Sequence, residues 1–328
     1  MKAVIIKHYG GPEVLQIDDI ATPIPAIGEV LIKIHAFGLN RAECYMRQGA
    51  WGDVAKITGI ECVGEIMEDP SGKLQRGDKV IALMGGMGRN RNGSYAEFTT
   101  IAATNVIPVE THLSWTELAA IPESYSTAWA CLHQNMHINA GDVILIRGGT
   151  SALGQAAINI ASQIDGVTVI ATTRSTHRFT FLKNLGCSEV YIEKNNIADK
   201  IRATHFDGID SVLDIIGNST LLDSLKLVKK GGFVCNAGFL GGGDAIKFNP
   251  LEDMPPGINL NFFASFLFGQ KDFPLSDIPM QSIIKQAERG NYQCKPASVF
   301  AFNDIQKAHQ LMESSQSMGK IVVQIMPN

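Results

Sequence analysis

Apolar and polar side chains in the first third of the chain alternate with the two-residue period of β-strands. The clearest run is residues 29–36, where the sequence EVLIKIHA places an apolar side chain at every second position. Such alternation is typical of a strand with one buried and one polar face. Shorter strands are predicted at 2–7 and 14–18, with glycine- and proline-rich turns between them. The pattern indicates a β-rich domain.

The pattern changes at Ser114, where a helix is predicted to begin. Ser114 is followed by Glu117 at the spacing of a capping box, and Pro122 then separates this helix from a second helical segment. Beyond it, apolar strands alternate with amphipathic helices. The predicted strands are 142–146, 167–172, 209–215 and 232–236, and the predicted helices start at Leu153, Thr176 and Thr220. This alternation predicts an α/β fold with a doubly wound parallel sheet of the Rossmann type.

The chain is long enough for two domains. Its 328 residues exceed the roughly 250–300 at which a single core stops growing. After the Rossmann region the sequence returns to mixed segments and ends in a strand at 320–325, which we expect to rejoin the β-rich domain. We therefore predict a discontinuous β-rich domain, 1–118 with 268–328, and a Rossmann domain at 119–267.

A glycine-rich turn follows the first strand of the Rossmann region. Residues 143–147 run into Gly148–Gly154 and then into a helical pattern. Backbone N–H groups in such a turn approach a pyrophosphate, which the partial positive charge of the helix N-terminus also attracts. Ser151 stands at the second glycine of GxGxxG, so the motif alone also fits a plain structural turn. The predicted dinucleotide contacts here are Gly149, Thr150, Ser151, Ala152 and Leu153.

The end of the next strand bears on the choice of cofactor. NAD-binding proteins place Asp or Glu there to bind the ribose 2′-hydroxyl. This chain has no acid at that strand end and instead offers Thr173, Arg174, Ser175 and, one helical turn later, Arg178. Arginines suit a 2′-phosphate, so NADPH is predicted. The alternative is a solvated basic helix start, which leaves the choice open.

Two later strands of the Rossmann region end on glycines. Ligands of doubly wound sheets bind at the carboxyl ends of the strands, so these ends are candidates for the nicotinamide pocket. Ordinary turn chemistry explains them equally well. The candidate residues are Ile215, Gly217, Gly238 and Phe239, within the loops after residues 212–215 and 232–236.

The composition of the chain indicates which classes of binding partner to expect. A net charge of −4 gives no electrostatic basis for binding nucleic acid or an anionic membrane, so we expect a small-molecule partner. No apolar stretch approaches the roughly 20 residues of a membrane span, and no secretory signal is evident. The six cysteines are scattered without a CxxC pair, which predicts reduced core thiols and a cytoplasmic protein.

Four motifs together resemble those of the medium-chain dehydrogenase/reductase superfamily. They are GLNRAECYMRQG at 38–49, GIE at 59–61, GSYAEF at 93–98 and STA at 126–128. The zinc-dependent alcohol dehydrogenases of that superfamily hold a catalytic metal with Cys, His and Cys. Here those positions carry Asn40, Ile60 and Glu123, and the loop 85–93 lacks the cysteines of a structural zinc site. The chain therefore resembles the zinc-independent quinone oxidoreductase-like branch, with no metal site expected.

This resemblance implies a GroES-like catalytic domain and hydride transfer from NADPH to a quinone or an α,β-unsaturated carbonyl. It further implies that Asn40 and Tyr45 face the substrate, that Thr127 lies near the nicotinamide, and that the protein is a homodimer. Tyr45 as the proton donor is a hypothesis, and an amphipathic residue at a cleft edge is the alternative. Two other functions stay open: an enoyl-thioester reductase of the same superfamily, and a non-catalytic NADPH-binding sensor or structural protein.

Overall fold

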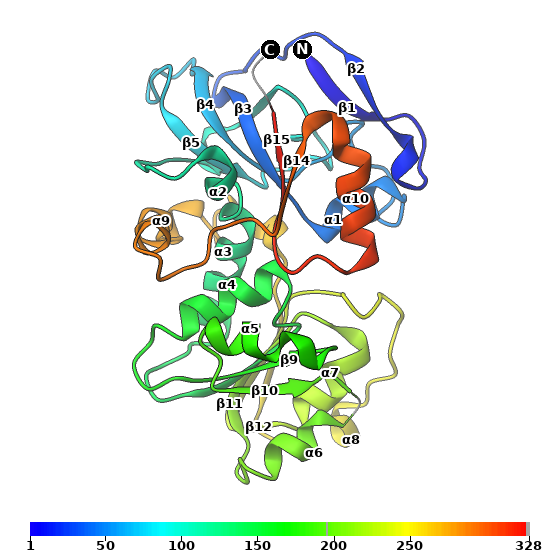
Figure 1. Cartoon of the computed structure of the whole chain (residues 1–328), viewed down its shortest axis with the longest axis vertical. Coiled ribbons are helices and arrows are strands. Elements are labelled where there is room, and N and C mark those ends of the chain that lie inside the picture. The colour runs from blue at the N-terminus through cyan, green and yellow to red at the C-terminus, as the bar shows by residue number, and fades with distance from the viewer. Residues whose placement is uncertain (195, 326–328) are drawn as a thin grey trace. The chain divides into compact units, whose positions relative to one another are not determined.

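A computed structural model describes residues 1–194 and 196–325. The chain divides into two compact units (Figure 1). The first comprises Met1–Ser126 and Ser265–Asn328, and the second comprises Thr127–Ala264. The sequence-based domains, 1–118 with 268–328 and 119–267, stay a prediction, and their residues 195 and 326–328 lie outside the described part.

The second unit contains a six-stranded sheet in the order β10-β9-β8-β11-β12-β13. Every neighbouring pair in it is parallel, and the green-to-yellow ribbon of Figure 1 follows these strands. The strands are β8 (Val143–Arg147), β9 (Thr168–Thr173), β10 (Glu189–Ile192), β11 (Ile209–Asp214), β12 (Val228–Asn236) and β13 (Asn259–Phe262). The predicted α/β fold with a parallel Rossmann sheet is therefore confirmed.

Short helices connect these strands, as right-handed parallel crossovers require. Strand side chains such as Leu145, Ile170 and Val212 are fully buried, which is typical of a parallel sheet covered on both faces. The connecting helices are a π-helix (Ala130–Asn135), α4 (Ala152–Ala161), a 3₁₀ turn (Thr176–Arg178), α5 (Phe179–Asn184), α6 (Ile197–Arg202), α7 (Asn218–Leu225) and α8 (Pro250–Asp253).

The first unit is built on a seven-stranded sheet with the order β14-β15-β3-β4-β5-β7, in which β6 also pairs with β3. Its long strand β3 joins distant parts of the sequence, because it pairs with β15 near the end of the chain (Figure 1). A separate two-stranded sheet pairs β1 with β2. The strands are β1 (Lys2–Ile6), β2 (Leu15–Asp19), β3 (Glu29–Leu39), β4 (Glu61–Glu68), β5 (Lys79–Leu83), β6 (Phe98–Ala102), β7 (Val106–Pro108), β14 (Ser298–Ala301) and β15 (Ile321–Gln324).

The helix after Ser114 begins with a capping box. The Ser114 side chain accepts a hydrogen bond from the Glu117 N–H, and the Glu117 carboxylate accepts one from the Ser114 N–H, so the predicted capping box is confirmed. The helices are α1 (Arg41–Arg47), α2 (Trp115–Leu118), α3 (Pro122–Trp129), α9 (Met280–Glu288) and α10 (Ile305–Ser314). Short 3₁₀ turns lie at Pro12–Val14, Ala103–Asn105, Ser265–Leu267, Leu275–Asp277 and Phe302–Asp304.

All six cysteines are free and buried, which confirms the prediction of reduced core thiols. Burial raises the pKa of the Cys62 thiol and of other cysteines, so these groups stay protonated. Within residues 1–194 and 196–325, no helix is long and apolar enough to cross a bilayer.

Candidate active site and cofactor site

The glycine turn lies between β8 and α4. Ser151 caps α4: its hydroxyl accepts a hydrogen bond from the Gly154 N–H at 3.0 Å and donates one to the Gly148 carbonyl at 2.8 Å. Gly148 has a φ of +85°, which favours glycine. A Cβ on Gly154 would lie 2.4 Å from the Gly148 oxygen, so only glycine lets the helix pack this closely against the turn.

This geometry fits the phosphate group of a dinucleotide. Residues 149–153 form the turn and the first positions of α4, where helix N–H groups lack intrahelical partners. Those groups point out of the helix N-terminus and carry its partial positive charge. The residues from Gly149 to Leu153 thus lie together at the N-terminus of α4, and their contacts with a dinucleotide stay a prediction.

The basic residues predicted to hold a 2′-phosphate follow β9. Thr173 is buried at the strand end, whereas Arg174 is exposed. The Arg178 guanidinium donates a hydrogen bond to the Thr150 hydroxyl at 3.2 Å. The structure therefore brings the end of β9 and the glycine turn together, although they are separated by a helix and a strand in sequence. Ser175 precedes the 3₁₀ turn and lies between the two arginines in sequence.

The loops after β11 and β12 pack closely against each other and share backbone hydrogen bonds. Asp214 ends β11 and accepts hydrogen bonds from the Ile216 and Gly217 N–H groups at 3.0 and 2.9 Å. Gly217 has a φ of +90°, and a Cβ there would lie 2.3 Å from the Gly238 carbonyl oxygen. The predicted candidates Ile215, Gly217 and Gly238 are therefore adjacent.

Two polar and aromatic features border these loops. The ring centroids of Phe239 and Phe262 are 5.8 Å apart. Asn236 ends β12, is 5% exposed, and its Nδ2 has no hydrogen-bond partner. A buried donor without a partner is costly, so this amide fits a site where a ligand supplies the acceptor. Thr127 is buried in α3, and its predicted position beside the nicotinamide stays a prediction.

In the first unit, Asn40 lies in a buried polar cluster. Its Nδ2 donates to Glu61 Oε1 at 2.9 Å, and its Oδ1 accepts from the Lys320 ammonium at 2.6 Å. Lys320 Nζ lies 2.5 Å from Glu61 Oε1 and 3.3 Å from the Ser124 hydroxyl. Glu61 is fully buried, and its second oxygen accepts from the Glu123 N–H at 2.8 Å. Both ends of the Asn40 amide are thus engaged, while the prediction that Asn40 faces the substrate is untested.

Glu43 is the second buried carboxylate of this cluster. It accepts hydrogen bonds from the N–H groups of Asn40 at 2.7 Å and Ile60 at 3.2 Å. Burial raises its pKa to about 7, the nearby Lys320 opposes this rise, and the Glu61 carboxylate adds to it. Below about pH 7 the buried Glu43 carboxyl therefore favours its protonated form.

Tyr45 lies on α1, half-buried, and its ring centroid is 5.6 Å from that of Trp51. Burial raises the pKa of its hydroxyl, and the nearby Arg41 charge only partly offsets this. The hydroxyl therefore keeps its proton at neutral pH, as a proton donor must.

The positions that would hold a catalytic zinc do not fit one. They carry the amide of Asn40, the alkyl side chain of Ile60 and the carboxylate of Glu123. The Asn40 oxygen already accepts from an ammonium, and zinc prefers nitrogen and sulfur ligands. Across residues 1–194 and 196–325, no group of three or more His, Cys, Asp or Glu side chains is placed to hold a metal ion.

Sequence reasoning missed a second buried cluster, centred on His309 of α10. Arg47 donates to His309 Nδ1 at 3.2 Å, and Nε2 lies 3.0 Å from the Tyr95 hydroxyl. Because a guanidinium can only donate, Nδ1 accepts and Nε2 carries the hydrogen. Burial lowers the His309 pKa to about 3, so the ring is neutral and ties α1 to α10.

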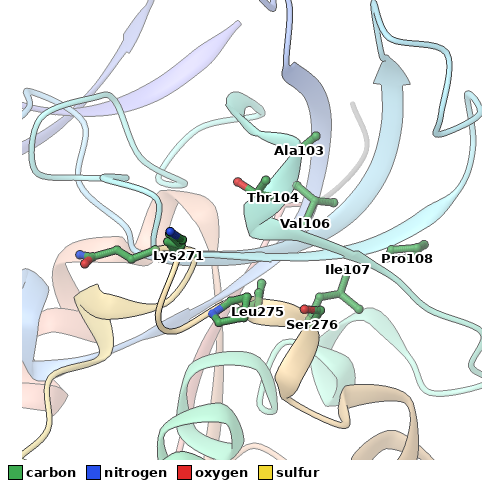
Figure 2. A pocket seen from close by; sticks show the side chains of 11 residues that line it. Ala103, Thr104, Val106, Ile107, Pro108, Lys271, Leu275 and Ser276 are labelled. Atoms are coloured by element: carbon green, nitrogen blue, oxygen red, sulfur yellow. The ribbon is translucent and has the colours of Figure 1, made fainter.

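A pocket of about 470 Å³ lies elsewhere in the first unit (Figure 2). Val106, Ile107 and Leu275 give it an apolar wall, and Lys271 lies at its side. None of the predicted site residues lines it.

Comparison with known proteins places the chain in a family. Residues 26–111 match the alcohol dehydrogenase GroES-like domain, and residues 152–279 match the zinc-binding dehydrogenase domain. The quinone oxidoreductase of Rattus norvegicus is 30% identical over 98% of this chain and 97% of its own length.

Solved structures agree in fold. The quinone oxidoreductase from Coxiella burnetii superposes with a TM-score of 0.83 at 25% identity, covering 99% of each chain. Mycobacterial Rv1454c complexed with NADPH superposes with a TM-score of 0.87 at 23% identity, again covering 99% of each chain. The chain is an oxidoreductase of the medium-chain dehydrogenase/reductase superfamily and belongs to its quinone oxidoreductase-like branch.

Proposed function

We propose that this protein is a zinc-independent, NADPH-dependent reductase that transfers a hydride to a quinone or to an α,β-unsaturated carbonyl. The observation that carries the proposal is the basic edge of the Rossmann sheet, where Arg178 bonds to Thr150 of the glycine turn and Arg174 follows β9. Family membership supports the reaction class, and this edge supports the cofactor.

The preference for NADPH rests on charge. A 2′-phosphate at the end of β9 would lie within reach of two guanidinium groups, and charge-assisted hydrogen bonds of this kind contribute about 1.5–3 kcal/mol each. That is enough to change the relative affinity for two cofactors by about tenfold to a hundredfold. The pyrophosphate of the dinucleotide would be held by residues 149–153. The nicotinamide would be held by Ile215, Gly217, Gly238, Phe239 and Thr127.

Zinc independence rests on the donor set around Asn40. Lys320 brings a fixed positive charge to Glu61 and Asn40, where a bound metal would need anionic or imidazole ligands. The chemistry then requires neither a Lewis acid nor a covalent nucleophile from the chain.

The chain's own part in the reaction is positioning and proton supply. When bound, NADPH supplies the hydride that reduces the substrate. Tyr45 keeps its proton at neutral pH and can donate it to the enolate oxygen or carbon that the reduction leaves anionic. The locked loops after β11 and β12 hold their backbone in one geometry, which limits the motion of a ligand bound there.

We further propose that the protein is cytoplasmic and homodimeric. The six reduced, buried thiols are consistent with a reducing compartment. The dimer rests on the family resemblance alone.

Steady-state oxidation of NADPH and NADH by the metal-stripped protein tests the proposal, with a small quinone, an alkenal and an enoyl thioester offered separately. We expect turnover without metal, NADPH preferred, and the quinone or alkenal reduced. Turnover only after zinc is restored, or only with NADH, would contradict the proposal. Turnover of the thioester alone would make the protein an enoyl-thioester reductase, and NADPH binding without any turnover would favour a sensor.

A further inference from the structure

Arg147 is a fully buried arginine at the last position of β8, directly before the glycine turn. Its Nε donates to Glu193 Oε2 at 3.2 Å and its Nη2 to Glu193 Oε1 at 2.5 Å, which is a two-pronged pairing of guanidinium and carboxylate. Its Nη1 donates to Asp223 at 2.9 Å and to the Ser224 hydroxyl at 3.0 Å. A guanidinium has no second geometry that satisfies all of these acceptors, so both carboxylates are fixed.

The network also reaches the loop after β11. Ser224 donates to Asp214 Oδ2 at 2.7 Å, and Asp214 accepts from the N–H groups of Ile216 and Gly217. Arg147 therefore bonds α7 directly and β11 through Ser224, and it bonds Glu193 with its remaining nitrogens.

Glu193 lies beside the end of β9, the strand end at which dinucleotide-binding proteins bind the adenosine ribose. It follows β10, the neighbour of β9, and its N–H donates to the Thr173 carbonyl at 2.8 Å. Arg174 is the next residue after Thr173. In NAD-binding doubly wound sheets the acid that accepts from the ribose 2′-hydroxyl stands at the end of the strand after the glycine turn, which is β9 here. Glu193 follows the neighbouring strand, and a free carboxylate this close to the end of β9 would repel a 2′-phosphate. The Glu193 side chain is 10% exposed because Arg147 draws it inward.

We propose that Arg147 is a positioning residue for cofactor selectivity, which holds the Glu193 carboxylate inside the domain and so leaves the edge beside Arg174 to a 2′-phosphate. The inference rests on the proposed use of a nicotinamide dinucleotide. It adds a buried residue, distinct from the two arginines after β9, that sets the choice between NADPH and NADH.

The first test replaces the carboxylate without breaking the pairing. Glu193→Gln keeps an oxygen that accepts from Arg147 and removes the negative charge. Dissociation constants for NADPH and NADH are measured by the fluorescence of each bound cofactor. If Arg147 already keeps the Glu193 carboxylate away from the cofactor, the ratio of the NADPH to the NADH dissociation constant stays within about twofold of wild type. A clear rise in NADPH preference would mean that Glu193 acts on the ribose in the wild type, and would overturn the proposal.

The second test releases the carboxylate. In Arg147→Met, Glu193 loses its partner, and we expect the NADPH preference to fall by about tenfold or more. The double variant Arg147→Met/Glu193→Gln should regain most of the preference, because it has no charge to release. Equal weakening of both cofactors in Arg147→Met, or no recovery in the double variant, would show a merely structural role.

Folding is checked by circular dichroism before binding is measured. If Arg147→Met does not fold, Arg147→Lys replaces it, since a single ammonium nitrogen cannot reproduce the two-pronged pairing of the guanidinium with Glu193. The NADPH preference of Arg147→Lys should fall by less than that expected for Arg147→Met. An unchanged preference would overturn the proposal.

The cofactor preference of the wild type distinguishes a failure of the proposed function from a failure of this inference. Wild-type preference for NADH would overturn the proposed cofactor and this inference with it. Wild-type preference for NADPH, together with a ratio that does not respond to Arg147, would overturn this inference alone.

Discussion

The ammonium of Lys320 lies 2.5 Å from the carboxylate of Glu61, and both side chains are almost completely buried. The pair joins the residue before β15, near the end of the chain, to the first residue of β4. Asn40 and Ser124 complete the hydrogen bonding of the ammonium. A buried ion pair whose partners are all satisfied fixes one arrangement, since either charge left alone inside the protein is costly.

Removing the ammonium should therefore be strongly destabilising. We expect Lys320→Met to lower the free energy of unfolding by about 3 to 5 kcal/mol, because Glu61 is left as an unpaired buried charge. Urea unfolding measures the loss. Lys307→Met is the matched control: its exposed pair with Asp304 contributes about 0.5 kcal/mol or less. The double variant Lys320→Met/Glu61→Gln should be more stable than Lys320→Met, and a double variant as unstable as the single one would contradict this account.

Glu43 gives the stability of the protein a dependence on pH. Its pKa is raised from 4.5 to about 7 on folding, so the folded state binds the proton more tightly than the unfolded state. The folded state therefore loses stability as pH rises from about 4.5 through 7. Relative to Glu43→Gln, which cannot ionise, the wild type should lose about 2 to 3 kcal/mol between pH 5 and pH 8. If the free energy of unfolding changes equally with pH in both proteins, Glu43 is not the source of this pH dependence.

His309 has the opposite dependence. Burial lowers its pKa from 6.5 to about 3, so the unfolded state binds the proton more tightly. This contribution to stability is complete above pH 6.5 and is lost as pH falls toward 3. Relative to His309→Gln, the wild type should lose about 3 kcal/mol more between pH 7 and pH 4. The measurement is chemical unfolding at each pH, and equal losses in the two proteins would mean that His309 does not titrate in this range.

The sequence predicted most elements because their periodicity is local. The alternation at 29–36 marked a strand, which in the structure extends from Glu29 to Leu39, where both faces are buried. The helix expected from Thr176 begins instead as a 3₁₀ turn, and the α-helix starts at Phe179. Helix ends depend on contacts beyond the local pattern, so such shifts are typical.

The buried polar clusters were not predicted, since long-range pairing creates them. Glu61 meets Lys320 only because β3 lies between β4 and β15 in one sheet. Arg147 carried a signal that could have been used: a lone charge at the end of the apolar run VILI needs a buried partner. Its partners Glu193 and Asp223 could not be found without the order of the strands.

The arginines after β9 should act on NADPH alone. Arg178→Gln removes a charge beside Thr150, and we expect the affinity for NADPH to fall by about tenfold to a hundredfold while the affinity for NADH changes by less than about twofold. Titration with each cofactor measures this, and the exposed Arg289 supplies the control variant Arg289→Gln. Equal losses for both cofactors would place the Arg178 contact at the shared pyrophosphate instead.

Tyr45 is tested as proton donor by removing one oxygen. We expect Tyr45→Phe to lower kcat for an enone by about a hundredfold, because the ring and its contact with Trp51 remain while the donated proton is lost. Tyr9→Phe is the control, since the Tyr9 hydroxyl donates to the Gly52 carbonyl on an exposed part of the same unit. NADPH affinity should be unchanged in both variants. If Tyr45→Phe turns over as fast as wild type, the proton comes from water, and Tyr45 acts only as an amphipathic wall.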